Sequence, residues 1–351
     1  MKNMKRLTLT ILLMVSFVFC GCWAPENSIN VDLIADGGVT LHFIDVGQGD
    51  CTLIQLASGE NILIDAGDMG KEEIILDYLR SCGVKHIDHL VATHPHNDHI
   101  GSMQAIVEEL GIGKIYMPKV AHTTQTYENL LLSIKKKGLK ITQAKAGVKM
   151  DVNAMFDACF VAPNSDNYES LNDYSAVLKL TYKDQAFLFT GDAEPVSRQE
   201  ILDGGYDIKA DVLKVPHHGS SQSALNAEFL DKVAPKLAII SVGTDNRYGH
   251  PHREIMQLLQ KAKTEVLRTD INGTIVISCD GDKLTIKPSI EVRNQDPVTN
   301  QPQEKYIGNK KSQVFHLSNC RNLPEAHNQV YFSQREEAIE SGFRPCSNCN
   351  P

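Results

Sequence analysis

The sequence predicts an α/β fold arranged as a four-layer αββα sandwich, in which two sheets pack face to face and helices cover their outer faces. Three observations predict it. Between about residues 40 and 288, short β-branched runs alternate with longer amphipathic stretches. This rhythm occurs twice, and each half is rich in strands. A stretch rich in Gln, Asn and Pro then precedes a cysteine-containing segment, for which we expect a small α+β module.

Length and composition set the domain plan. The chain has 351 residues, of which 42% are apolar and 22% charged, enough for one large core and a smaller module. We expect the main domain over residues 38–290 and the module over residues 306–351. Residues 291–305 have almost nothing to bury and are expected to form a linker.

The first residues do not belong to that fold. Three basic residues precede an apolar run from Leu7 to Phe19, which is too short for a permanent membrane span and is typical of a secretory signal. The small Gly21 before Cys22 resembles the bacterial lipobox, which implies cleavage after residue 21, acylation of Cys22 and a tether over residues 22–37. An ordinary signal peptide or a short uncleaved anchor is the alternative. We therefore expect an extracytoplasmic protein, either a membrane-anchored lipoprotein or a secreted one.

The charge of the chain bears on its partners. Removal of the three basic residues of the leader would take the formal net charge from -8 to -11. Residues 305–351 carry +2, so residues 22–304 carry -13. Such a surface repels polyanions at long range, which counts against a nucleic-acid substrate.

The first half of the main domain contains three strand patterns separated by Gly-rich turns, followed by helix, strand and helix patterns. The three strands are expected to share one sheet. In chain order the segments are LHFID, CTLIQL, NILIDAG, EEIILDYLRSC, DHLVAT and SMQAIVEELG.

The second half repeats the rhythm, with helices between several strands. Its six predicted strands are SAVLKLTY, QAFLFTGD, DVLKVPHHG, LAIISVG, EVLRTD and TIVISCD.

The loop that leaves the strand DHLVAT carries an unusual set of polar residues. His94, His96, Asp98 and His99 form the pattern H-x-H-x-D-H within six positions. Imidazole and carboxylate are the usual ligands of zinc and similar divalent ions, and a tight loop can point several of them inward. A single histidine would more simply be an ordinary surface or core residue, but four such residues together predict one or two metal ions.

This pattern resembles the signature of the metallo-β-lactamase superfamily, in which an aspartate at the end of an earlier strand precedes H-x-H-x-D-H. Here that aspartate is Asp65 in ILIDAGD. The resemblance implies the αββα sandwich of that superfamily, a hydrolase activity, and a supporting role in which Asp65 orients a ligand histidine or the loop backbone.

Four further motifs are similar to those of the extracytoplasmic hydrolase domain in the ComEC family of competence DNA-uptake proteins. They occur in order between Phe43 and His252, and the resemblance spans roughly residues 40–288. The motifs are FIDVGQGD, LFTGD, DVLKVPHHGS and SVGTDNRYGHPH.

Carried over residue by residue, the resemblance implies that Asp192 bridges two metals and that His217 completes the second metal site. His218, Ser220 and His250 would face the substrate, and Asp98, His218 and His250 would take part in the chemistry. Histidines beside a water activated by two cations can hold phosphate oxygens or protonate a leaving group.

Structural alternatives exist for four residues of these motifs. Asp192 follows a glycine and could cap the helix AEPVSRQE. His250 and His252 flank Pro251, a pattern that also occurs in helix-start turns. Asp50, in DVGQGD, could serve a tight hairpin rather than the site.

The chain departs from the superfamily pattern at one position. Typical members have another histidine ligand before the bridging aspartate, but this interval contains only His122, in PKVAHTTQ. The corresponding position is NDYSAV, with Asn172 and Ser175, as in the ComEC-like branch. A first metal site with fewer ligands suits an exchangeable ion such as manganese rather than two tightly held zinc ions. We expect two divalent ions, zinc or manganese.

The tail repeats a ligand pattern of another kind. His316-x3-Cys320 and Cys346-x2-Cys349 have the spacing of a tetrahedral zinc site. The segment resembles the metal-binding domain of the Ada DNA-repair protein, with a histidine where that family's first cysteine stands. We expect one structural zinc. The alternative is a Cys320–Cys346 disulfide that leaves Cys349 free.

These inferences predict a metal-dependent phosphodiesterase or nuclease that acts on DNA in a competence-related role, anchored to the membrane through its lipid. One alternative is a phosphodiesterase for cell-wall teichoic acid or phosphocholine esters. Another is a non-catalytic DNA-binding surface lipoprotein. The missing histidine and the ComEC-like motifs argue against β-lactam hydrolysis. The chain also lacks the apolar segments of a multi-helix channel, so we expect no direct transport role.

Overall fold

The computed structural model describes residues 38–220, 225–244 and 246–290 of the main domain. In the tail it describes residues 306–317, 320–325, 328–332 and 335–349. The predicted leader, the lipidation site at Cys22, the tether and the linker lie outside the described residues. Within the described residues no helix combines the length and the apolar character needed to cross a membrane.

The first sheet has eight strands in the order β14-β13-β1-β2-β3-β4-β5-β6. Strands β3 to β6 run parallel, and the others pair antiparallel. The strands are β1 Val39–Phe43, β2 Thr52–Leu56, β3 Asn61–Ile64, β4 His86–Val91, β5 Gly111–Met117, β6 Ile141–Gln143, β13 Ile275–Cys279 and β14 Leu284–Pro288.

The second sheet has six strands in the order β12-β11-β10-β9-β8-β7. Strands β9 to β12 run parallel, whereas β7, β8 and β9 form an antiparallel meander. The strands are β7 Phe156–Ala162, β8 Val177–Tyr182, β9 Gln185–Phe189, β10 Val212–Lys214, β11 Leu237–Ile240 and β12 Glu265–Arg268.

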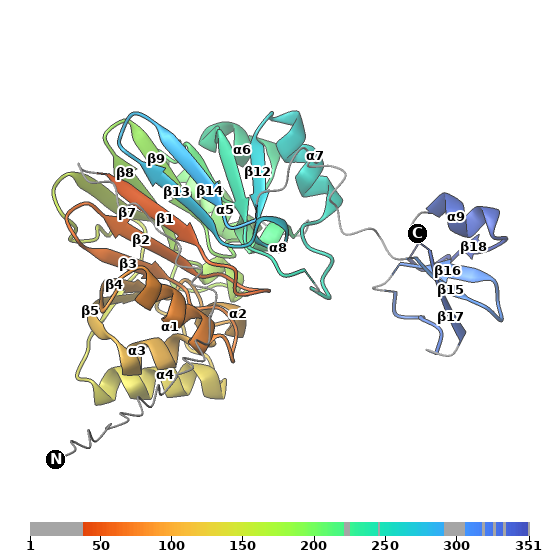
Figure 1. Cartoon of the computed structure of the whole chain (residues 1–351), viewed down its shortest axis with the longest axis horizontal. Helices are drawn as coiled ribbons and strands as arrows, with labels where there is room; N and C mark the ends of the chain where they lie inside the picture. Colours follow the sequence, from red (N-terminus) through yellow and green to blue (C-terminus); the bar gives the residue numbers. More distant parts are fainter. Residues whose placement is uncertain are drawn as a thin grey trace, which may run out of the picture. The chain divides into compact units, whose positions relative to one another are not determined.

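One pair of strands departs from the expected division into two halves. The segment TIVISCD follows the strands of the second sheet in the sequence, yet as β13 it pairs with β1 of the first sheet, in the register Leu41↔Ile277. Figure 1 shows β13 and β14, in blue, beside the red strand β1. The last strands of the domain therefore complete its first sheet.

Three apolar layers hold the sandwich together. The middle layer lies between the sheets and joins Phe43 and Ile54 of the first to Phe160 and Phe187 of the second. The outer layers lie beneath the helices, which Figure 1 shows on the outer faces of the two sheets. The helices over the first sheet are α1 Glu72–Ser81, α3 Met103–Glu109 and α4 Gln125–Lys136; those over the second are α5 Pro195–Asp203, α6 Ala227–Val233 and α7 Arg253–Lys261.

Helix α1 shows why these segments fold as they do. Its residues Ile75, Leu76 and Leu79 share one helical face and are buried against the sheet. Acidic residues occupy its first turn and Arg80 its last, so these charges interact favourably with the helix dipole. The remaining short elements are α2 Asn97–Ile100, α8 Thr269–Asn272 and the 3₁₀ turns Asn172–Tyr174 and Pro216–Gly219.

The tail forms a small α+β unit with its own core. Four strands in the order β17-β15-β16-β18 and one helix enclose a core of Tyr306, Phe315, Phe332 and Ala338. The elements are β15 Tyr306–Asn309, β16 Val314–His316, β17 Gln329–Phe332, α9 Arg335–Glu340 and β18 Arg344–Pro345.

Candidate metal centre

The candidate site lies where loops leave the carboxyl ends of strands from both sheets. His94 follows β4, and the short helix α2 carries Asp98 and His99. Asp192 follows β9, and the 3₁₀ turn after β10 contains His217 and His218. Because chemistry in α/β folds gathers at the carboxyl ends of parallel strands, loops far apart in the sequence can supply one site.

Asp192 is the centre of this site. It is buried, and its carboxylate is surrounded by imidazole nitrogens. Its Oδ1 lies 3.2 Å from His99 Nε2. Its Oδ2 lies 3.6 Å from His218 Nε2, 3.8 Å from His217 Nε2 and 4.0 Å from His94 Nε2. The helix-cap alternative for Asp192 is wrong, because α5 begins only at Pro195, after Glu194.

Four side chains form a ready group of metal ligands. One ligand atom from each of Asp98, His99, Asp192 and His218 lies within 4.8 Å of the others. His218 Nε2 also lies 3.2 Å from Asp98 Oδ2. The group contains His218, for which the sequence predicts a substrate contact, and lacks His217, for which it predicts a metal contact. His217 is more exposed and directs its Nδ1 toward Glu194 Oε1 at 3.3 Å.

The left-handed turn after β10 explains why these neighbours differ. His217 has φ 49° and His218 has φ 52°, a backbone conformation that residues other than glycine rarely adopt. Such positions cost about 1–3 kcal/mol each and are concentrated at functional sites. The turn directs His218 inward, where its Nδ1 donates to Ser241 O at 2.8 Å.

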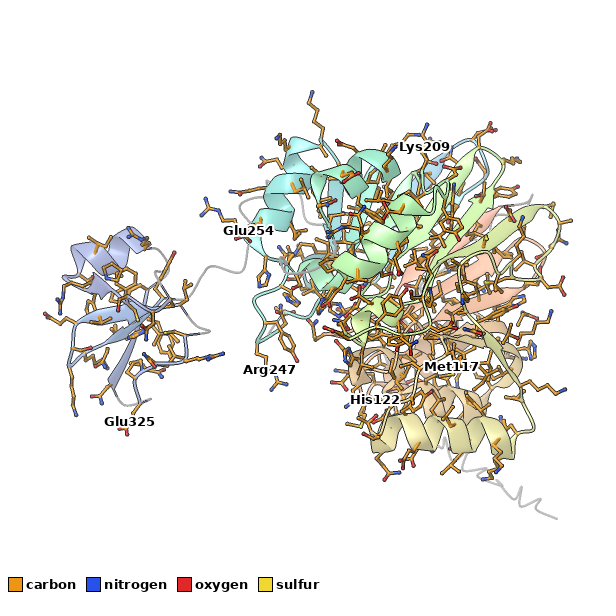
Figure 2. All side chains as sticks on the ribbon, turned by 180° about the vertical axis from the view of Figure 1, so that it is seen from behind. Met117, His122, Lys209, Arg247, Glu254 and Glu325 are labelled. Atoms are coloured by element: carbon orange, nitrogen blue, oxygen red, sulfur yellow. The ribbon has the colours of Figure 1, made fainter. Side chains whose placement is uncertain are left out.

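His94 and His96 form a second group beside Asp192. His94 Nε2 lies 3.0 Å from His96 Nδ1. Ser175 Oγ lies 3.4 Å from His94 Nδ1 and accepts a hydrogen bond from Asp192 N. The serine therefore touches both His94 and the loop of Asp192, at the position where the superfamily pattern has a histidine. His122, on the loop after β5 (Figure 2), has its ring 6.5 Å from that of His96.

Asp65 supports the site from behind. Its φ is 60°, and the residue is fully buried at the end of β3. It accepts hydrogen bonds from the backbone N–H and the hydroxyl of Thr93, and its Oδ2 lies 2.7 Å from His99 Nδ1. A proton on Nδ1 leaves Nε2 of His99 as the ligand atom that faces Asp192.

Asp50 and Lys214 form a buried ion pair that the sequence did not reveal as a unit. Lys214, at the end of β10, also donates to Gly191 O at 3.3 Å. Asp50 lies 3.4 Å from His218 Nδ1, so it belongs to the site rather than to a hairpin alone. Its neighbour Gly49 has φ 131°, and a Cβ there would lie 2.4 Å from Asp98 O. A charged residue within the apolar run VLKV was the available signal for Lys214.

The charges of the buried residues shift their proton equilibria. Burial lowers the pKa of His99, but the carboxylates of Asp192, Asp65 and Asp98 outweigh it and raise that pKa well above its ordinary value. The pKa of His218 rises to about 10, because Asp192 and Asp50 outweigh the effect of its burial. Burial raises the pKa of Asp50, but the Lys214 ammonium and nearby histidines lower it overall.

This donor set fits divalent cations. Two ligand groups that share His99 contain four carboxylates, those of Asp98 and Asp192 in one and of Asp50 and Asp65 in the other. Lys214 pairs with Asp50. Among the described residues, His99 Nε2 and Asp192 Oδ1 are buried 3.2 Å apart but have no hydrogen-bond geometry between them. A cation held by imidazole and carboxylate would contact both atoms and offset the buried negative charge of the aspartates. The site therefore has the chemistry of a divalent-metal centre.

Of the remaining predicted residues, Asn172 and Ser220 both contact His217. Asn172 donates to Glu194 Oε1 at 2.8 Å, and its Nδ2 lies 3.5 Å from His217 Nδ1. Ser220 is buried, and its backbone N–H donates to His217 O. His252 occupies the N-cap position of α7, so the helix-start alternative holds for His252.

His250 lies in the site instead. Its ring stacks at 6.2 Å from that of His218, and its buried Nδ1 makes no hydrogen bond among the described residues. Burial, with the rings of His218, His252 and His217 nearby, lowers the pKa of His250 to about 3.

The tail contains a separate ligand group. Ligand atoms of His316, Cys320, Cys346 and Cys349 lie within 4.8 Å of one another. The cysteines are free thiols, so the disulfide alternative does not occur in this structure. The backbone N–H groups of Leu317 and Asn348 donate to Cys349 Sγ and Cys346 Sγ. Burial raises the pKa of Cys346, but backbone N–H groups outweigh it and lower that pKa, whereas burial and the neighbouring thiols raise the pKa of Cys349 to about 11. The group suits a zinc ion.

Comparison with known families gives two matches. Residues 44–243 match the metallo-beta-lactamase superfamily. Residues 293–351 match the metal binding domain of Ada.

Several curated proteins are similar to this chain. ComE operon protein 3 of Bacillus subtilis is 35% identical over 263 residues, which cover 69% of this chain and 33% of the relative. Recombination protein 2 of Haemophilus influenzae is 29% identical over 249 residues, which cover 70% of this chain and 29% of the relative. Competence protein ComA of Neisseria gonorrhoeae is 29% identical over 269 residues, which cover 76% of this chain and 34% of the relative. The chain spans about a third of the length of these relatives.

Proposed function

The chain belongs to the metallo-beta-lactamase superfamily of hydrolases, and from that premise we propose that it is a metal-dependent phosphodiesterase that cleaves DNA outside the cytoplasm. A lipid on Cys22 would hold it at the membrane. The observation that carries the catalytic part is the Asp192 carboxylate, which has four imidazole nitrogens within 4.0 Å. The similarity to a recombination protein and to a competence protein supports DNA as the substrate.

We assign two ions to this centre, zinc or manganese. Asp98, His99 and His218 would hold one, His94 and His96 would hold the other, and Asp192 would contact both. When bound, two such ions supply positive charge beside a phosphodiester and make water a nucleophile at neutral pH.

The residues of the chain arrange the rest of the reaction. Asp65 fixes the ring of His99, and Lys214 neutralises Asp50 behind His218. His250 presents a buried Nδ1 that makes no hydrogen bond among the described residues and can contact a phosphate oxygen. Fixed donors and charges of this kind stabilise a transition state without reorganisation.

The experiment is a turnover assay on the purified protein. We expect hydrolysis of bis-p-nitrophenyl phosphate and of single-stranded DNA with added manganese or zinc. Asp98→Ala and Asp192→Asn should abolish both activities. Asp77→Ala, at an exposed carboxylate on α1, is the control and should leave both unchanged. If neither substrate is hydrolysed with manganese or with zinc, the proposal is refuted.

The ligand assignment can be tested through metal content rather than activity. His218→Ala should lower the metal bound per chain after dialysis by about one ion, because it removes a member of the group around Asp98. His217→Ala should retain more metal, since His217 is partly exposed and faces Glu194. Greater metal loss from His217→Ala than from His218→Ala would restore the assignment that the sequence predicts.

The acidic surface favours a second candidate substrate, a wall phosphodiester such as teichoic acid. Turnover of the small diester without cleavage of DNA would select this candidate. Deletion of the tail distinguishes the two candidate phosphodiesterases from a non-catalytic DNA-binding protein. An enzyme without its tail should still hydrolyse the small diester, whereas a receptor that binds through the tail should lose its affinity for DNA.

A further inference from the structure

The loop between β11 and α7 carries an exposed aromatic residue and an exposed cation at the rim of the metal centre. Tyr248 is 49% exposed, and the Cζ of Arg247 lies 5.5 Å from the centre of its ring. Figure 2 shows Arg247 at the outer end of this loop. Gly243, at the start of the loop, donates to Gln48 Oε1, so the loop borders the segment that contains Asp50.

A stack of rings connects Tyr248 to the metal centre. The rings of Tyr248 and His250 lie 5.6 Å apart at 23° to each other. The rings of His250 and His218 lie 6.2 Å apart, also at 23°. His218 belongs to the ligand group around Asp192. An exposed aromatic face therefore lies two ring-to-ring steps from the reacting centre.

The loop is held in this shape by its own hydrogen bonds. The Asn246 side chain donates to Gly243 O and His250 O, and accepts from His250 N at 2.8 Å. His252 Nε2 lies 3.1 Å from Tyr248 O. Because the backbone is fixed on both sides of Tyr248, binding against its ring costs little additional ordering.

We propose that Tyr248 and Arg247 form a nucleotide subsite that binds single-stranded DNA beside the metal centre, a substrate assignment that rests on the proposed phosphodiesterase function. A base stacks on the exposed face of Tyr248, and the Arg247 guanidinium contacts a backbone phosphate. Every base offers a π-face, so stacking of this kind selects single-stranded nucleic acid over a wall polymer that lacks bases. The guanidinium lies over the ring in the free protein, and it can give way to a base because an exposed cation–π contact is weaker than base stacking.

The test measures binding with the full chain carrying Asp98→Ala, so that bound DNA is not cleaved. Three probes are compared by fluorescence anisotropy: a labelled single-stranded oligothymidylate, an abasic oligomer of equal length and charge, and a duplex. The parent should bind the oligothymidylate more tightly than the other two. Tyr248→Ala should weaken oligothymidylate binding by about tenfold and leave abasic binding unchanged, the loss expected for one stacked base. Tyr248→Phe should bind as the parent does.

Arg247 is tested with the same probes. Arg247→Ala should weaken binding of the base-containing and abasic strands by the same factor and reduce the salt dependence of both, because the contact is to phosphate. Lys209→Ala removes an exposed cation from the far end of the domain and should change neither (Figure 2).

Two results would overturn the subsite. One is equal binding of oligothymidylate and abasic strands by the parent. The other is an unchanged preference for bases in Tyr248→Ala. Failure of the phosphodiesterase proposal is separate, since it would appear as absent turnover of the small diester by the unmutated chain. If the chain does not hydrolyse the small diester but still prefers base-containing strands through Tyr248, the nucleotide subsite is supported and the phosphodiesterase activity is not.

Discussion

Asp65 Oδ2 lies 2.7 Å from Nδ1 of His99, and both side chains are fully buried. Asp65 is not a member of the group around Asp192, yet it decides which nitrogen of His99 faces that carboxylate. Ligand orientation at this metal centre therefore depends on a carboxylate that lies behind it.

Asp65→Asn should weaken metal binding by about 10- to 100-fold, because a neutral amide with one acceptor oxygen attracts the Nδ1 proton less strongly and orients the His99 ring less firmly. Competition with a chelating dye measures the affinity. Asp68→Asn, on the same loop, is the matched control and should keep the affinity of the parent. Equal affinities in the two variants would show that Asp65 does not orient His99.

Lys214→Met should lower the free energy of unfolding by about 3–5 kcal/mol, because it leaves Asp50 as a buried charge without its ammonium partner. Lys236 pairs with Asp211 at 2.8 Å, but its side chain is 72% exposed. Lys236→Met should therefore cost about 1 kcal/mol or less. Urea unfolding of both variants gives the comparison, and similar costs would contradict a structural role for the buried pair.

His42 should make stability depend on pH. Burial lowers its pKa to about 4, so the folded state keeps the ring neutral while the unfolded chain protonates it near pH 6.5. Between these values the unfolded state binds more protons, and stability falls as the pH falls. The full effect is about 3 kcal/mol and is complete near pH 4.

The measurement is the free energy of unfolding from pH 7 to pH 4 for the parent and for His42→Gln. The variant should lose less stability over this range than the parent. His86→Gln, at an exposed histidine of β4, controls for the loss of a histidine as such. Parallel curves for His42→Gln and the parent would show that His42 is not the group responsible.

Cys346→Ser should remove one equivalent of zinc and unfold the tail, because a small core of this size depends on its metal. Metal analysis after dialysis and limited proteolysis report the two effects. Cys159→Ser, at a thiol on β7 outside the ligand group, should retain the full zinc content. Full zinc retention in Cys346→Ser would exclude the tail site.

The sequence predicted the parts of the site that short spacing encodes. His94, Asp98 and His99 are neighbours in the chain, so their shared position on one loop could be inferred directly. The ion pair of Lys214 and Asp50 joins residues more than 160 positions apart, and neither residue alone indicates its partner.

The choice between His217 and His218 depended on backbone geometry. Both follow β10, and only the left-handed turn decides which imidazole enters the group around Asp192. Periodicity predicted the layers of the fold, because buried strands and amphipathic helices have distinct patterns. It did not predict that β13 would join β1, since pairing partners are set by the tertiary structure.

The position of β13 against β1 has a consequence for how the domain can be made and shortened. Strand β1 begins the described domain, but one of its two edges is covered only after residues 275–279 have been synthesised. Until then β1 presents free backbone donors and acceptors to any other strand. A chain that ends before Ile275 would retain most residues of the metal centre and yet expose an edge prone to aggregation, so the usable limit of a fragment lies at the end of β14.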